Sequence, residues 1–214
     1  MVIAIDGPAA SGKSSVARTL ARKLQFVYVN TGAMYRAIAW HAVEQKVPTL
    51  DAERVVALLT RTRVECGLAG KESTILINGV DPTAHLSEEA VNLNVSNIAT
   101  VPEVRRLLVA LQREYAIGQD VVMEGRDIGS TVFPETPYKF YIDASAEVRA
   151  LRRARQGLQD SISARDKLDS SRRTSPLTIA EDAHVIDSSN LTVDGVVGEV
   201  FGRLKQKGLP LGDL

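Results

Sequence analysis

The chain has 214 residues, of which 44% are hydrophobic and 24% are charged, so it can bury one core of ordinary size. Its 26 basic and 26 acidic residues cancel, which leaves no overall positive field to attract nucleic acid. Cys66 is the only cysteine, so no intramolecular disulfide can form, and this fits a reducing compartment. The first residues lack the pattern of a signal peptide, and no apolar run approaches the roughly 20 residues of a membrane helix. We therefore expect a cytoplasmic protein, a monomer, without nucleic-acid or membrane partners.

The first thirty residues predict a strand, a helix and a second strand. Residues 2–5 form a short β-branched apolar run that stops at Gly7 and Pro8, which is typical of a buried strand entering a loop. From Ser14 to Leu24 apolar residues recur at helical spacing, and residues 26–29 are again apolar. Two strands joined by a helix over so short a stretch indicate a parallel sheet.

The rest of the chain continues this α/β pattern, with one interruption. Further strands are predicted at residues 121–123, 140–142 and 185–186, and helices at 101–115, 146–155 and 192–207. Residues 64–80 instead form two alternating runs around a glycine-containing turn, which predict a β-hairpin. Because an antiparallel hairpin is out of place in a parallel core, we interpret residues 64–90 as an inserted lobe.

Residues 7–14 match the phosphate-loop pattern G-x-x-x-x-G-K-[ST] in full. The match follows an apolar strand and opens an amphipathic helix, which is the context that the motif requires. Backbone N–H groups of such a loop bind phosphate oxygens, Lys13 would reach the β- and γ-phosphates, and the Ser14 hydroxyl is the expected Mg²⁺ ligand. The predicted ATP-binding residues are Gly7, Pro8, Ala9, Ala10, Ser11, Gly12, Lys13, Ser14 and Ser15.

Three further segments carry polar groups where ligands could bind. Thr31 and Arg36 follow the second strand; Thr31 alone is best read as a helix cap, whereas Arg36 is a candidate substrate contact. Residues 124–129 place Arg126 beside Asp127 at a strand end. This segment is either an anion clamp or a surface turn in which the two side chains pair with each other. Residues 149–173 are rich in arginine, which is typical of a solvated helical face or of a loop that closes over a triphosphate.

These segments together resemble the bacterial cytidylate kinases, a branch of the nucleoside monophosphate kinases. The resemblance runs from Val2 to about Thr192, and the similar segments are GPAASGKSS, TGAMYR, SNIATVPEVRRLL, EGRDIGSTVFP, ARDKLDSSRRTSPL and DSSNLT. It implies a three-layer P-loop kinase core with a parallel sheet, over residues 1–30, 101–150 and 177–214 of a single chain. A monophosphate-binding region would span about residues 31–100, and a short arginine-rich lid about residues 151–176.

The resemblance also implies a role for individual residues. Arg36, Arg126 and Arg172 would hold the phosphate of the acceptor nucleotide. Ser96, Arg105 and Asp127 would read the cytosine edge with Thr31 nearby, and Arg165 and Asp169 would contact the sugar hydroxyls. The expected reaction is Mg²⁺-assisted transfer of phosphate from ATP to CMP or dCMP, with the residues Lys13, Arg126, Arg165 and Arg172 acting in catalysis.

Two positions depart from the family pattern, and rival functions remain. Asn30 stands where relatives often have Asp. The stretch between Arg155 and Arg165 is shorter than in many relatives, so the sequence does not determine the geometry of the lid. The nearest rival is a P-loop kinase of UMP, AMP, GMP or a non-nucleotide such as shikimate. A GTPase-like switch is disfavoured because the chain has no N-K-x-D segment, and a nucleic-acid-binding module because the net charge is zero.

Overall fold

The computed structural model describes residues 1–155 and 177–209. Within these residues seven strands form one sheet in the order β3-β4-β2-β5-β1-β6-β7, and only β3 and β4 pair in antiparallel fashion. The strands are β1 (Val2–Asp6), β2 (Val27–Asn30), β3 (Val64–Ala69), β4 (Glu72–Ile77), β5 (Val121–Gly125), β6 (Tyr138–Asp143) and β7 (His184–Asp187). The predicted α/β fold with a largely parallel sheet is confirmed.

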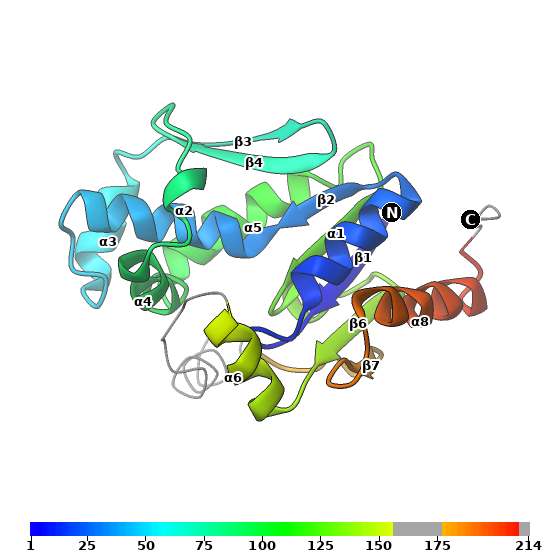
Figure 1. The fold of residues 1–214 in the computed structure, drawn as a ribbon. Coiled ribbons are helices and arrows are strands. Elements are labelled where there is room, and N and C mark those ends of the chain that lie inside the picture. Colours follow the sequence, from blue (N-terminus) through cyan, green and yellow to red (C-terminus); the bar gives the residue numbers. More distant parts are fainter. Residues whose placement is uncertain (156–176, 210–214) are drawn as a thin grey trace.

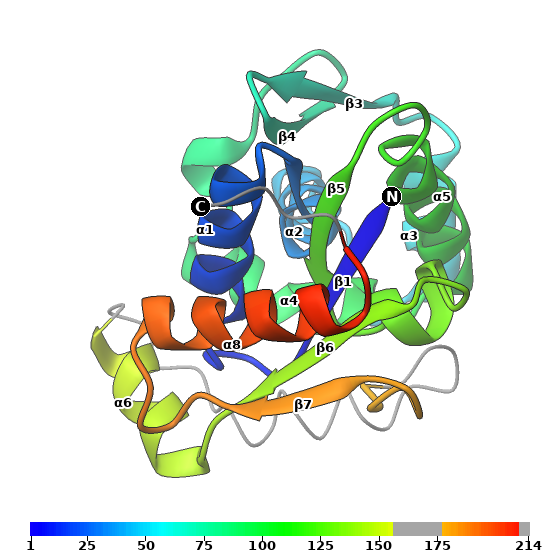
Figure 2. The ribbon, with the colours of Figure 1, turned by 90° about the vertical axis from the view of Figure 1, so that its right-hand side faces the viewer.

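Helices cover both faces of the sheet, which gives three layers (Figures 1 and 2). Alternation along β1 explains the layering, because Ile3 and Ile5 pack on one face and Ala4 packs on the other. The first face is covered by α1 (Lys13–Leu24) and α8 (Val193–Gln206). The second is covered by α2 (Thr31–Glu44), α3 (Ala52–Leu59), α4 (Glu89–Ile98) and α5 (Pro102–Glu114).

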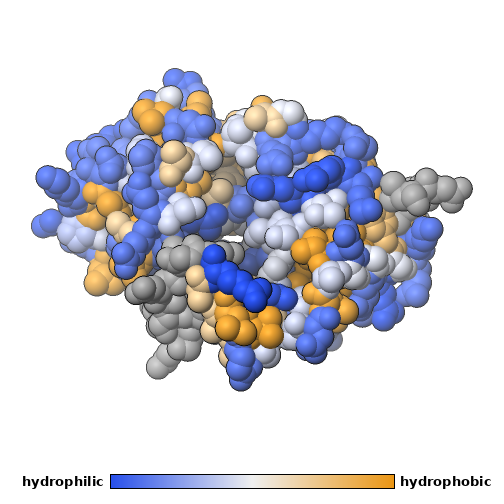
Figure 3. Space-filling view, in the orientation of Figure 1, coloured by the Kyte–Doolittle hydropathy of each residue, from blue (hydrophilic) through white to orange (hydrophobic). Residues whose placement is uncertain are grey.

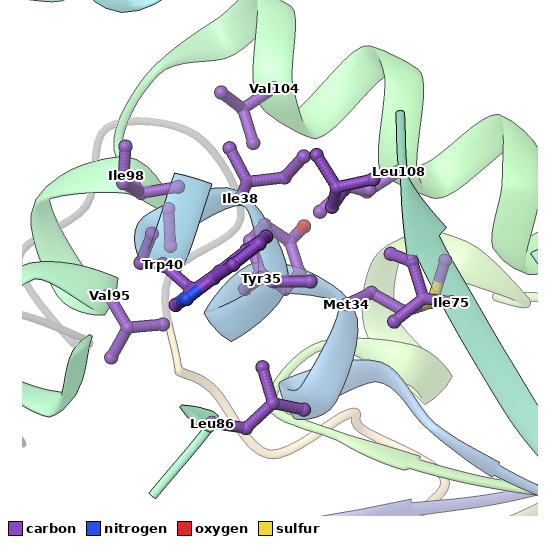
Figure 4. Packing of buried hydrophobic residues seen from close by; sticks show 14 of the residues in the cluster. Met34, Tyr35, Ile38, Trp40, Ile75, Leu86, Val95, Ile98, Val104 and Leu108 are labelled. Carbon is purple, nitrogen blue, oxygen red and sulfur yellow. The ribbon is translucent and has the colours of Figure 1, made fainter. Parts of the chain in front are cut away.

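The core of the second face is built around α2 (Figure 4). Its Met34 and Ile38 are at most 2% exposed and pack with Ile75 of β4 and Leu108 of α5. Burial of one such side chain stabilises the fold by about 1.5–3 kcal/mol. Because α2 starts at the carboxyl end of β2, this packing fixes its first turn beside the phosphate loop.

The predicted hairpin forms over β3 and β4, and it extends the sheet. Tyr28 of β2 is paired in parallel with Glu72 of β4, and the Tyr28 N–H donates to the Lys71 carbonyl over 2.8 Å. Asn30 N–H also donates to the Ser73 hydroxyl over 3.1 Å. The hairpin is therefore an insertion in the sequence that continues the sheet beyond β2 in space.

The remaining elements agree with the sequence pattern or add to it. The helix predicted at residues 101–115 is α5, the helix predicted at 146–155 is α6 (Ala146–Arg155), and the helix predicted at 192–207 is α8. No sequence prediction was made for α3 or α4, nor for the short helical turns η1 (Thr83–His85) and η2 (Ile128–Val132). None of the helices in the described part of the chain is long and apolar enough to cross a membrane.

Candidate active site

The phosphate loop connects β1 to α1, and two glycines give it its shape. A Cβ on Gly7 would lie 2.1 Å from the Ile142 carbonyl oxygen, so β6 leaves no room for a side chain there. Gly12 caps α1 with φ of 89°, a left-handed conformation that glycine adopts at little cost. Lys13 is 7% exposed, and its Nζ donates to the Pro8 carbonyl over 2.9 Å. The loop therefore curves around its own lysine.

Arginines of α6 hold the loop by its carbonyl oxygens. Arg149 Nη1 donates to the Ala9 carbonyl over 3.3 Å, and Arg152 Nη1 donates to the Ser11 carbonyl over 3.1 Å. Ser188, which follows β7, also donates its hydroxyl to the Ser11 carbonyl, over 2.8 Å. Because these donors occupy loop carbonyls, the N–H groups of the loop and of the start of α1 remain as its anion-binding side.

Glu124 lies next to the loop at the carboxyl end of β5 and is 3% exposed. One of its carboxylate oxygens accepts from the Ser14 hydroxyl and the other accepts from the Tyr28 hydroxyl, each over 2.8 Å. Burial and the neighbouring Glu124 charge raise the pKa of Tyr28, so the phenol stays protonated and acts as a donor. Thr31 donates its hydroxyl to the Glu124 carbonyl over 2.7 Å, which ties α2 to the same residue.

A cavity of about 650 Å³ opens from the phosphate loop along the carboxyl ends of β2 and β5. The surface in this region is hollowed above α6 and largely hydrophilic (Figure 3). Six basic residues line it: Lys13, Arg18, Arg36, Arg105, Arg126 and Arg153. The concentration of cationic side chains in one hollow is the arrangement expected for a polyphosphate ligand.

The charges of the neighbouring basic residues affect the pKa of Arg36. Burial lowers the pKa of the Arg36 guanidinium, and the positive charges of Arg126 and Arg153 lower it further, while Glu124 opposes them. Arg36 remains ionised because arginine titrates far above neutral pH. A bound anion would relieve the repulsion among these arginines, so the cluster favours a phosphate between them.

The far end of the cavity holds a buried ion pair. Arg105 of α5 and Asp127 after β5 are 3% and 5% exposed, and they form a direct hydrogen-bonded salt bridge. The Arg105 guanidinium also lies 5.7 Å from the ring centre of Tyr35. Ser96 of α4 is 5% exposed and lines the same region. Buried polar groups of this kind discriminate among ligands by hydrogen bonding.

The cap of α2 differs from the sequence interpretation. The Asn30 side chain, not that of Thr31, accepts from the Ala33 N–H over 3.0 Å and so caps the helix. Thr31 is 3% exposed and uses its hydroxyl on Glu124 instead. The cap reading of Thr31 is therefore wrong, and the departure at Asn30 is explained by a capping role, which Asn fills well.

Most of the residues predicted for the site meet around this cavity. Its lining includes Ala9, Ala10, Gly12, Lys13, Ser14, Ser15, Thr31, Arg36, Ser96, Arg105, Arg126 and Asp127. Among the described loop residues, Gly7, Pro8 and Ser11 do not line it. Arg165, Asp169 and Arg172 lie outside the described residues.

Sequence reasoning missed several residues of this site. Glu124 was part of the segment that pointed to Arg126 and Asp127, but received no role of its own. Arg153 was read as part of a basic stretch of uncertain purpose, yet it lines the cavity. An acidic residue that directly follows buried strand residues, as Glu124 does, was the available signal.

Comparisons with known proteins agree with this geometry. The sequence profile of a family described as cytidylate kinase matches residues 3–206. The chain is 43% identical over 210 residues to a cytidylate kinase of Desulforamulus reducens, covering 93% of this chain and 94% of that protein. It is 40% identical over 215 residues to a cytidylate kinase of Clostridium botulinum strain Langeland, covering 95% and 97%.

The likeness to one solved structure is weaker. A shikimate kinase from Aquifex aeolicus is 14% identical, with a TM-score of 0.44 over 99% of this chain and 100% of that one, a likeness too weak to bear on function. The family match spans nearly the whole sequence, and the relatives are matched over nearly their full length. The chain therefore belongs to the cytidylate kinase family.

Proposed function

We propose that the chain transfers the γ-phosphoryl group of ATP to the 5′-phosphate of CMP or dCMP, giving CDP or dCDP. One observation carries the proposal beyond family membership. A single cavity joins Lys13 and Ser14 of the phosphate loop to the buried Arg105–Asp127 pair. A triphosphate at one end and a nucleoside monophosphate at the other would bring their phosphates together near Arg36 and Arg126.

At the donor end, loop N–H groups and the start of α1 would bind the β-phosphate of ATP, and Lys13 would move from Pro8 to the phosphates. The Ser14 hydroxyl and the Glu124 carboxylate lie 2.8 Å apart, and such oxygen donors fit Mg²⁺. Magnesium sites of this kind usually keep several waters and phosphate oxygens as ligands, which would complete the coordination here. Bound Mg²⁺ would supply charge neutralisation on the phosphates.

At the acceptor end, Ser96, Arg105 and Asp127 would hydrogen-bond the cytosine edge. These three residues are at most 5% exposed, so a base that failed to match them would leave buried polar groups unsatisfied. A site built in this way rejects a mismatched base by a factor of up to about 10⁴–10⁵. This supports a narrow choice of acceptor base.

The chemistry needs little beyond positioning and charge. The acceptor phosphate is already ionised, so no strong general base is required. Arg36 and Arg126 would orient the acceptor and neutralise charge as the phosphoryl group moves. The parts assigned to Arg165, Asp169 and Arg172 stay predictions, as does the division of the chain into core, monophosphate-binding region and lid.

The test is ADP production with Mg-ATP and each of CMP, dCMP, UMP, AMP, GMP and shikimate. We expect rapid turnover with CMP and dCMP and little with the purine monophosphates. Turnover with a different acceptor and none with CMP would reject the base-reading roles of Ser96, Arg105 and Asp127. We further propose that the chain acts as a monomer in the cytoplasm; sedimentation at assay concentration would contradict the monomer if it gave twice the chain mass of 23.2 kDa.

A further inference from the structure

Asp6 is a buried acid that none of the roles above uses. It ends β1, immediately before the phosphate loop, and is 5% exposed. Its Oδ1 accepts from the Ile128 N–H and its Oδ2 accepts from the Gly129 N–H, each over 2.8 Å. These partners lie 122 and 123 residues away in the sequence. The carboxylate therefore links the start of the phosphate loop to the segment that follows β5.

The two N–H groups are the first of the helical turn η2. The first N–H groups of a helical turn have no partner within it, and the side chain of the residue before the turn usually accepts from one of them. In η2 that residue is Asp127, whose side chain makes no capping hydrogen bond. Asp127 forms the salt bridge with Arg105 instead. Asp6 thus supplies the cap that Asp127 would otherwise supply.

We propose that Asp6 is a positioning residue for the acceptor nucleotide: it caps η2 in place of Asp127 and so keeps the Asp127 carboxylate in the cavity beside Arg105. The inference rests on the proposed function, since it concerns the base-reading end of the same site. If Asp6 could no longer accept from both N–H groups, Asp127 would turn toward Ile128 and Gly129, and the pair with Arg105 would weaken.

The surroundings of Asp6 suit this role. The charged groups that act on it are Asp127, which disfavours its ionised form, and Lys13, which favours it. Across the turn, a Cβ added to Gly129 would lie 3.1 Å from the alkyl chain of Lys139 and 3.4 Å from Asp6 Oδ2. The turn is therefore held closely between β1 and β6, and Asp6 is its hydrogen-bonding anchor.

The first test is Asp6→Asn, which keeps the shape but offers one acceptor and turns an amide NH₂ toward the second N–H. Loss of one hydrogen bond to a charged group corresponds to roughly a 10–100-fold rise in KM for CMP. The KM for ATP should change by less than about twofold, because the loop N–H groups are untouched. The matched control is Asp143→Asn, the same change at the end of β6, whose carboxylate accepts from the Ala144 N–H of the next residue.

A structural role alone would affect both substrates, so equal rises in KM for ATP and CMP would overturn the proposal, as would an unchanged KM for CMP. The double variant Asp6→Asn/Asp127→Asn separates the two acids. If Asp6 acts through Asp127, the second substitution adds less than its own effect, whereas fully additive effects would reject the mechanism. Should Asp6→Asn not fold, Asp6→Glu keeps the charge, displaces the two oxygens and provides the same comparison.

A measurement without any acceptor distinguishes this proposal from the proposed function. Amide hydrogen exchange at Ile128 and Gly129 in the nucleotide-free protein should be faster in Asp6→Asn than in the wild type and unchanged in Asp143→Asn. Unaltered exchange would reject the capping role. If the wild type phosphorylates an acceptor other than CMP, the proposed function fails, and the same KM comparison on that acceptor still decides whether Asp6 positions it.

Discussion

The Ser14 hydroxyl donates a 2.8 Å hydrogen bond to a carboxylate oxygen of Glu124, although the two residues are 110 positions apart in the sequence. The other oxygen of Glu124 accepts from Tyr28. One acid thus connects the first turn of α1, the end of β5 and the middle of β2. Its orientation at the mouth of the phosphate loop is set by the fold itself.

This arrangement makes Glu124 sensitive to an uncharged replacement. In Glu124→Gln the amide nitrogen cannot accept from a hydroxyl, so one of the two hydrogen bonds must reverse its direction, and the negative charge is lost. We expect kcat to fall by roughly tenfold or more and the Mg²⁺ concentration for half-maximal rate to rise, on the scale of one charged hydrogen bond. Steady-state kinetics over a Mg²⁺ titration measures both.

Tyr28→Phe is the matched control, since it removes the bond to Oε1 and leaves the Ser14 bond in place. Its Mg²⁺ requirement should resemble that of the wild type. A Glu124→Gln enzyme with wild-type kcat and Mg²⁺ dependence would show that Glu124 only supports the fold.

Removal of the loop lysine tests the phosphoryl-transfer assignment. Lys13→Ala should lower kcat by about two or more orders of magnitude, because a preorganised cation on the transferring group is lost. The fold should persist, which thermal unfolding followed by circular dichroism would check. Lys23→Ala, on the exposed surface of the same helix, should keep normal turnover. Near-normal turnover of Lys13→Ala would refute the mechanism.

Variants of the buried Arg105–Asp127 pair test protein stability and base recognition separately. Arg105→Met leaves the Asp127 charge without its partner, which should lower the free energy of unfolding by about 3–5 kcal/mol and raise the KM for CMP far more than that for ATP. Arg105→Met/Asp127→Leu should regain much of the stability, because no charge is left buried alone. It should not regain the use of CMP. Recovery of both properties in the double variant would mean that the pair does not read the base.

Asp6 gives the stability of the protein a definite pH dependence. Burial is the main cause that raises its pKa from 3.8 to about 7, with the Asp127 charge adding to the rise, while the two N–H bonds and Lys13 lower it. The folded state therefore binds a proton more tightly than the unfolded state. The contribution of Asp6 to stability is fully present below about pH 4. It is lost as the pH rises toward 7, by roughly 1.4 kcal/mol per pH unit.

Urea unfolding of wild type and Asp6→Asn between pH 5 and 8 would measure this effect. The stability of the wild type relative to Asp6→Asn should decline as the pH rises and level off above the pKa of Asp6. If the difference in stability stayed constant over this range, the pKa of Asp6 would lie outside it.

Two glycines on α8 offer a gain in stability away from the site. Gly198 and Gly202 lie in the exposed part of the helix, and beyond the backbone of the helix itself a Cβ at either position would have no atom of the described residues within 4 Å. Each Gly→Ala substitution should raise the free energy of unfolding by about 0.5–1 kcal/mol. Denaturant unfolding measures this gain, and unchanged kinetics with CMP would confirm that the site is unaffected. A loss of stability would contradict the open environment.

The sequence predicted what depends on local pattern. The apolar run before Gly7, the phosphate-loop spacing and the helical period after Ser14 are contained within 24 residues, and they specified a strand, loop and helix that form as expected. Family resemblance extended this to Ser96, Arg105 and Asp127, and these residues do lie around one cavity with the loop. Their individual roles remain predictions for the kinetic tests.

What could not be predicted depends on contacts between distant segments. Nothing near Glu124 in the sequence indicates that Ser14 and Tyr28 will meet it, because that follows from β5 lying between β1 and β2. The cap of α2 was assigned one residue too late, since Asn30 and Thr31 are both good capping types and only the strand geometry decides between them. The hairpin was recognised, but its pairing with β2 depends on an edge that local pattern does not reveal.

The position of β1 between β5 and β6 also governs when the ATP site can exist. Val2 pairs with Val121, and Asp6 pairs with Gly125 on one side and with Tyr141 on the other. During synthesis the phosphate loop leaves the ribosome first, yet the strands that hold it follow more than a hundred residues later. Such long-range pairing is slow to form. The nucleotide site is therefore among the last parts of the nascent chain to be assembled, and ATP can stabilise only a protein that has almost finished folding.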